Sequence, residues 1–112
     1  MFVNYDETGY AEPVAGIRMK TLVYGENSLM TRFELAQGAQ LPAHSHPQEQ
    51  TGYLISGRII LHIGDQSYEA GPGDSWSISG DVEHRAEILE NSVALEVFSP
   101  VREDYLPKDD RI

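Results

Sequence analysis

The stretch GAQLPAHSHPQEQTGYLISG, residues 38–57, decides how the whole chain is interpreted. His44 and His46 are two residues apart, and alternate residues of a strand point to the same face of a sheet. Gln50 keeps this parity after a short bend at a proline, so its amide oxygen could join the two imidazoles. An H-x-H pair alone is a weak signal, because nearby histidines are more often surface or core residues than ligands. The interpretation therefore depends on what surrounds the pair.

Turn-forming residues interrupt the chain roughly every 8–12 residues, and the segments between them are rich in β-branched, aromatic and leucine residues. Polar and apolar residues alternate in several segments, and none shows a convincing apolar period of 3.6 residues. We expect strands at 17–24, 29–35, 52–55, 58–63, 74–78, 83–89 and 93–99. Such a series predicts an all-β sandwich or barrel, whose mouth can enclose a small ligand.

The length of 112 residues suits one domain, for which we expect a core at about 17–100, an N-terminal arm at 1–13 and a C-terminal tail at 107–112. Because cysteine is absent, a metal site would need histidine and oxygen ligands. The start of the chain lacks a signal-peptide pattern, and no apolar run reaches the ~18 residues of a transmembrane helix. We therefore expect a cytoplasmic protein without membrane contact.

The formal net charge of -10 makes nucleic acid an improbable partner, because phosphate contacts need clustered lysine and arginine. The same negative field would repel an acidic metabolite. An anionic substrate could bind only where a local positive centre overcomes this field.

Two motif spacings in the chain resemble those of the cupin superfamily. The first cupin motif, G-x5-H-x-H-x3–4-E-x6-G, is matched by Gly38, His44, His46, Gln50 and Gly57, with glutamine in place of glutamate. The second, G-x5-P-x-G-x2-H-x3-N, is matched in spacing by Gly73, Ser79, Asp81, His84 and Ile88, with three changes of residue type. The resemblance implies an all-β double-stranded jelly-roll barrel with His44, His46, Gln50 and His84 as metal ligands. This donor set suits Ni, Zn, Mn, Fe or Co, with one or two positions left for water or substrate.

Gln50 changes the charge of such a site, because a neutral amide leaves a divalent centre near +2 where glutamate would leave it near +1. The site would then attract an anion. Alternatively, the glutamine could mean only that the site binds a metal more weakly or binds none. Gly52 has the same parity, and we expect it to leave empty space beside the metal for a ligand. Trp76 would wall the pocket or serve in the core.

Glu96 and Phe98 share a strand face near the end of the chain. If Phe98 points inward, so does Glu96, and a buried carboxylate needs a partner. Arg102 could reach Glu96, clamp a substrate carboxylate through its planar fork, or lie on the surface.

The segment HSHPQEQTGYLISG and the ending VFSPVREDYL together resemble the small single-domain cupins of the KdgF type. This resemblance implies ring opening and ketonisation of 4,5-unsaturated monouronates from pectin or alginate breakdown, without redox change. It also implies functional roles for Glu96, Phe98 and Arg102, although the acidic position is usually aspartate in that family. We expect Glu96 to transfer the proton, and Arg102 to hold the substrate carboxylate or tune Glu96.

Three other functions compete with this interpretation: an oxygen-dependent, dioxygenase-like cupin, an isomerase or epimerase of another sugar acid, and a non-catalytic sugar-acid-binding cupin. The resemblance to small cupins also implies a homodimer, with residues 1–13 as the arm that crosses over. His62 has the opposite parity to its apolar neighbours and is interpreted as structural.

Overall fold

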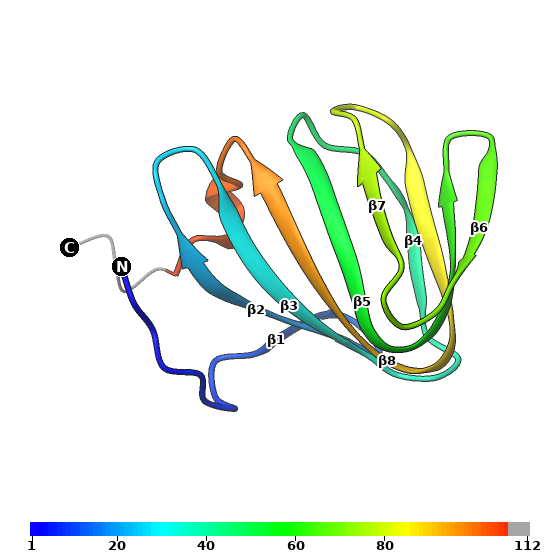
Figure 1. The fold of residues 1–112 in the computed structure, drawn as a ribbon, viewed down its shortest axis with the longest axis horizontal. Helices are drawn as coiled ribbons and strands as arrows, with labels where there is room; N and C mark the ends of the chain where they lie inside the picture. Colours follow the sequence, from blue (N-terminus) through cyan, green and yellow to red (C-terminus); the bar gives the residue numbers. More distant parts are fainter. Residues whose placement is uncertain (108–112) are drawn as a thin grey trace.

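The computed structural model describes residues 1–107. Within this range the chain forms eight β-strands and one short 3-10 helix, η1 (Figure 1). The elements are β1 (Ala11–Val14), β2 (Ile17–Tyr24), β3 (Leu29–Leu35), β4 (Gln40–His44), β5 (Glu49–Ile63), β6 (Gln66–Ala70), β7 (Ser75–Ile78), β8 (His84–Ser99) and η1 (Glu103–Tyr105). All strand pairs are antiparallel.

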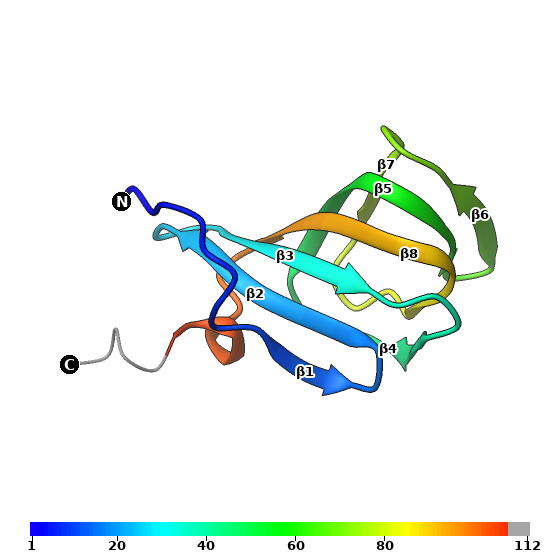
Figure 2. The same cartoon turned by 90° about the horizontal axis from the view of Figure 1, so that it is seen from below.

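Strands β5 and β8 pair along their length and belong to both layers of the fold. The first half of β5 pairs with β7 and with the second half of β8, which continues through β3 and β2 to β1. The second half of β5 pairs with β6 and with the first half of β8, whose other neighbour is β4. The two layers face each other across the interior (Figures 1 and 2). The predicted all-β jelly-roll barrel is thus confirmed.

The expectation of separate strands at 52–55 and 58–63, and at 83–89 and 93–99, was wrong, because each pair is one long strand. Gly57, which lies between two of the expected strands, adopts φ +92 inside β5, where the pairing register with β8 shifts. A Cβ at Gly57 would collide with Ser92, whose hydroxyl accepts from the Arg58 N–H at 3.0 Å. A bulge that needs glycine therefore bends the paired strands from one layer into the other.

Three strands at 11–14, 40–44 and 66–70 were absent from the expectation. β4 contains Pro42, a residue that usually interrupts strands, but β4 is paired on one side only and an edge strand tolerates proline. β6 is polar and exposed over most of its length, so its sequence carries little strand signal.

The interior between the layers is apolar except at one end. Ile17 and Leu54 are fully buried, and each such side chain contributes about 1.5–3 kcal/mol. The core cluster consists of Ile17, Leu35, Leu54, Ile59, Leu61, Ala70, Ala86, Ile88 and Ala94. Buried polar side chains from three segments, including Gln50, His84 and Glu96, close the interior at the end where the metal site was expected.

The N-terminal segment crosses the outer face of β2 (Figure 2). Lys20 holds it there, because its ammonium group bonds the Asp6 carboxylate at 3.1 Å and lies 5.4 Å from the Tyr5 ring centroid. The expected tail at 107–112 lies outside the described residues beyond Pro107. In residues 1–107, no helix has the length and apolar character needed to cross a membrane.

Candidate metal centre

Three histidines from separate segments converge at the polar end of the barrel. His44 ends β4 and pairs in register with His84, the first residue of β8, while His46 lies in the loop between β4 and β5. One ring nitrogen of each histidine lies within 4.8 Å of those of the other two. The structure therefore brings together the three imidazoles that the sequence predicted.

Two loops are fastened to each other beneath these histidines. The Asp81 N–H donates to the carbonyl of His46 at 2.8 Å, which ties the loop before β8 to the loop before β5. Asp81 adopts φ +66 at the position where the second cupin motif has glycine. Aspartate is among the few residues that tolerate this left-handed conformation, so the turn keeps its shape despite the substitution.

Backbone carbonyls fix the tautomer of all three histidines. Nδ1 of His44 lies 2.9 Å from the Pro42 carbonyl, Nδ1 of His46 lies 3.0 Å from that of Gln48, and Nδ1 of His84 lies 2.9 Å from that of Val82. A carbonyl only accepts, so each Nδ1 carries the hydrogen and each neutral ring keeps a lone pair on Nε2. A hydrogen bond from the other ring nitrogen to a carbonyl is typical of histidines that bind metals.

The fourth expected ligand, Gln50, lies beside His46. Its side-chain oxygen lies 2.9 Å from Nε2 of His46, and both residues are 8% exposed. Two ligand atoms at ~2.1 Å from one metal ion, at right angles, would be about 3.0 Å apart. His84 Nε2 is buried without a hydrogen-bond partner among the described residues. These donors fit a divalent transition ion, which would satisfy lone pairs that face one another.

Burial favours the neutral form of two of these imidazoles, as metal binding requires. Desolvation lowers the pKa of His46, and it lowers that of His84 from 6.5 to about 4. Arg102 and the neighbouring histidines lower the pKa of His84 further, because like charges disfavour the protonated form.

Glu96 is buried behind Gln50, on the adjacent strand β8. Its Oε1 accepts from the Trp76 indole N–H at 3.0 Å, and its Oε2 accepts from the Gln50 amide. Burial raises the pKa of Glu96 to about 8, although these two hydrogen bonds oppose the rise. A carboxyl group with this pKa exchanges its proton near neutrality.

The expectation that Gly52 leaves empty space beside the metal was wrong. Gly52 pairs in register with Glu96 on one side and with Trp76 on the other, and these two side chains meet over it. A Cβ at Gly52 would overlap the Trp76 indole and Oε1 of Glu96. The glycine therefore makes room for a contact between protein groups.

Phe98 and Arg102 line the same end of the barrel. Phe98 is fully buried, with its ring centroid 5.5 Å from that of His46. The Arg102 guanidinium carbon lies 5.0 Å from the Phe98 centroid and 3.9 Å from that of Tyr105. The Arg102 guanidinium donates to the Asp104 carboxylate at 2.8 Å. The side chains that donate to Glu96 are those of Gln50 and Trp76. Sequence reasoning missed Tyr105, although an aromatic residue three positions after Arg102 was a usable signal.

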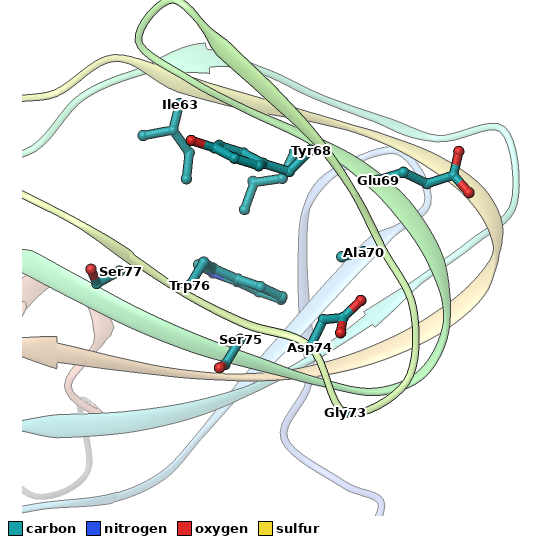
Figure 3. Close-up of a pocket in the computed structure, with 10 residues that line it drawn as sticks. Ile63, Tyr68, Glu69, Ala70, Gly73, Asp74, Ser75, Trp76 and Ser77 are labelled. Carbon is teal, nitrogen blue, oxygen red and sulfur yellow. The ribbon is translucent and has the colours of Figure 1, made fainter.

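Two cavities meet at Trp76. An interior cavity of about 50 Å³ is bounded by apolar side chains and by Gln50, His84 and Glu96. A larger cavity of about 620 Å³ is lined by residues of β5, β6 and β7, among them Tyr68 and Trp76 (Figure 3). The indole thus separates an open cavity from the buried carboxyl group.

His62 lies outside this centre. Its ring bonds the Ser67 hydroxyl at 2.7 Å and the Glu87 carboxylate at 2.6 Å. These contacts link β5 to β6 and to β8.

Known proteins resemble this chain in sequence and structure. The "Pectin degradation protein KdgF" of Dickeya dadantii is 27% identical over 103 residues, which cover 90% of this chain and 94% of that protein. The structure of KdgF from Halomonas sp. matches with a TM-score of 0.84 and 25% identity, over 89% of this chain and 93% of that chain. An RmlC-like cupin from Shewanella frigidimarina has a TM-score of 0.88 at 22% identity, over 94% and 95% of the two chains, and shows the shared fold.

Residues 31–99 match the family model described as the cupin domain, Cupin_2. This range holds both histidine motifs and the strands that carry them. The chain is therefore a member of the Cupin_2 family.

Proposed function

We propose that this protein is a metal-dependent cupin that opens and ketonises a 4,5-unsaturated monouronate from pectin or alginate breakdown. The observation that carries the proposal is that one amide, Gln50, contacts both the histidine cluster and a buried carboxyl group, Glu96. The similarity to KdgF proteins supports the substrate class. The cytoplasmic location expected from the sequence belongs to the same proposal.

His44, His46, His84 and Gln50 would hold the ion, whose metal we leave as one of Ni, Zn, Mn, Fe or Co. When bound, it would supply Lewis acidity toward the substrate carboxylate and the oxygen that becomes negative as the ring opens. The chain has a net charge of -10, so this positive centre would also attract an anionic substrate.

Glu96 would move the proton. The released enol becomes a ketone when carbon C4 of the sugar acid is protonated. A carboxyl with a pKa of about 8 can hold and release a proton near neutrality, which is what general acid–base catalysis requires. Trp76 and Gln50 fix both carboxyl oxygens, and Gly52 gives the carboxyl room.

Arg102 would bind the substrate carboxylate. Its side chain is 14% exposed and lies against Tyr105 and Phe98, which restrict it to the open end of the barrel. Its partner Asp104 is 60% exposed, so a substrate carboxylate could replace it at little cost. The planar guanidinium suits a bidentate carboxylate.

The experiment is a conversion assay on 4,5-unsaturated galacturonate with metal-loaded protein, following loss of the ultraviolet absorbance of the conjugated alkene. We expect conversion well above the spontaneous rate, and its loss in Glu96→Gln and His84→Ala. His62→Ala, which changes a histidine outside the centre, is the matched control. Metal binding without conversion would exclude this substrate, and oxygen uptake would then test a dioxygenase-like cupin.

We also propose a homodimer through the outer face of the first layer. Tyr53 and Ile55 of β5 are 47% and 42% exposed there, and Tyr53 is in register with the half-buried Leu95 of β8. At the tip of the N-terminal arm, Met1 and Phe2 are 76% and 86% exposed. Apolar patches of this kind are commonly covered by a partner.

A further inference from the structure

Three side chains from three neighbouring strands form one hydrogen-bonded chain. Trp76 of β7 donates its indole N–H to Oε1 of Glu96 on β8, at 3.0 Å. Gln50 of β5 donates its amide N–H to Oε2 of the same carboxyl group. The Gln50 oxygen is thereby turned toward the histidines, 2.9 Å from Nε2 of His46.

The direction of these hydrogen bonds follows from which groups can donate and which can only accept. An indole N–H donates and cannot accept, so it must be received by the Glu96 carboxylate. When Glu96 is ionised, its oxygens only accept, so the end of the Gln50 amide that faces Oε2 is the NH2 group. The reverse orientation would then set two oxygens against each other and turn the NH2 group toward the histidines.

Gly52 makes this arrangement possible. The backbone register aligns Trp76, Gly52 and Glu96 across three strands, with the glycine in the middle. The Trp76–Glu96 bond passes through the volume that a Cβ at residue 52 would occupy. Gln50 lies two residues before Gly52 and points to the same face of β5. Trp76 and Gln50 therefore belong to the same layer of the fold.

We propose that Trp76, acting through Glu96, fixes the orientation of the Gln50 amide and so presents its carbonyl oxygen, not its NH2 group, to a cation held by the three histidines. Trp76 is a positioning residue for a metal ligand. An amide ligand needs such help, because only one of its two ends can bind a cation, whereas either oxygen of glutamate could. This inference rests on the metal site of the proposed function and not on the uronate reaction.

The experiment is a zinc titration of metal-free protein, measured by competition with a chromophoric chelator. Trp76→Phe keeps an aromatic ring in place but removes the donor. We expect it to weaken zinc binding by roughly 10–100-fold, the usual cost of losing an outer-shell partner. Tyr68→Phe is the matched control, because it removes a polar group from the same cavity without touching Glu96, and it should leave affinity unchanged.

A double-mutant cycle separates orientation from packing. In a Gln50→Glu background there is no amide to orient, so adding Trp76→Phe should cost less than about 3-fold in zinc affinity. A packing role for Trp76 would give the same loss in both backgrounds, and that result would overturn the inference. So would unchanged affinity in Trp76→Phe. If the wild-type protein bound no zinc or other divalent transition ion, the metal site would fail and the inference with it.

The fluorescence of the single tryptophan gives a second readout. Because the Trp76 indole donates a hydrogen bond to Glu96, its emission should shift when Glu96→Leu removes the acceptor. It should also shift when zinc binds to the wild-type protein. Glu96→Gln should weaken zinc binding at least as much as Glu96→Leu, because its oxygen accepts from the indole and its NH2 group then faces Gln50, which favours the reversed amide. Wild-type zinc affinity in Glu96→Gln would contradict the inference.

Discussion

The side-chain oxygen of Gln50 lies 2.9 Å from Nε2 of His46, and neither atom carries a hydrogen to donate while the ring is neutral. Two acceptors at this distance repel each other unless a cation lies beside both. The same holds for His84, whose Nε2 is buried and unpartnered among the described residues. The site therefore combines metal-binding atoms that a positive ion would stabilise together.

Metal binding should stabilise the fold. A divalent ion that binds the folded chain at 100 times its dissociation constant would add about 2.7 kcal/mol to the free energy of unfolding. Thermal unfolding with and without chelator measures this. His84→Ala should abolish the increase, because it removes a ligand from the start of β8, whereas His62→Ala should retain it. An equal increase in both variants would place the ion elsewhere.

The stability of the metal-free protein should depend on pH through Glu96. Its pKa is about 8 in the folded chain and 4.5 when exposed, so between these values the folded state keeps a proton that the unfolded state has lost. The free energy of unfolding should therefore fall as pH rises from 4.5 to 8, by an amount on the order of a few kcal/mol. Glu96→Gln should remove this fall.

Denaturant titrations of both proteins, in chelator, test the prediction across that range. His84 contributes the opposite slope below pH 6.5, because its pKa is lowered to about 4 and the unfolded state then binds the extra proton. The difference between wild type and Glu96→Gln isolates the carboxyl. Parallel profiles would mean that Glu96 is ionised in the folded protein throughout.

Gly52→Ala should destabilise the protein by about 1–3 kcal/mol, the usual cost of overpacking. The added methyl group would overlap both the Trp76 indole and the Glu96 carboxyl, and β5 is held on both sides by paired strands. Gly25→Ala is the matched control, because nothing lies within 4 Å of a Cβ there. Chemical unfolding measures both. Equal stability of the two variants would mean that Trp76 moves aside freely.

Arg102→Ala should raise KM for the uronate by roughly 10–100-fold while kcat changes little, as expected when a charged hydrogen bond to the bound substrate is lost. Arg85→Ala, which changes an exposed arginine outside the site, should leave both parameters unaltered. Steady-state kinetics of the two variants provide the comparison. A loss confined to kcat would instead assign Arg102 to the chemical step.

The proposed dimer predicts a molecular mass of about twice 12.5 kDa in light scattering after size exclusion. Tyr53→Glu and Ile55→Glu together should convert it to a monomer, because each places a charge on the outer face of β5. Leu89→Glu, at another exposed apolar position, should leave the dimer intact. A wild-type protein that is monomeric at all concentrations would exclude the dimer.

Much of the fold could be predicted from local pattern. Alternation in Leu29–Leu35 identified β3, and turn residues marked most of the chain reversals. The errors lie where tertiary pairing overrides a local signal: Gly57 and Pro42 are breakers in isolation but occur within strands, one at a bulge and one on an edge. β6 was missed because its side chains are mostly exposed and need no apolar alternation.

The sequence by itself determined which groups are available at the centre. The spacing of His44 and His46 sets their shared direction, and the neutral amide of Gln50 sets the charge of the donor set. Only the tertiary structure decided what lies behind that amide. Trp76 and Glu96 meet over Gly52 because three strands from distant parts of the chain pair in one register. That register depends on the bulge at Gly57 and on burial of the core, which no local spacing specifies.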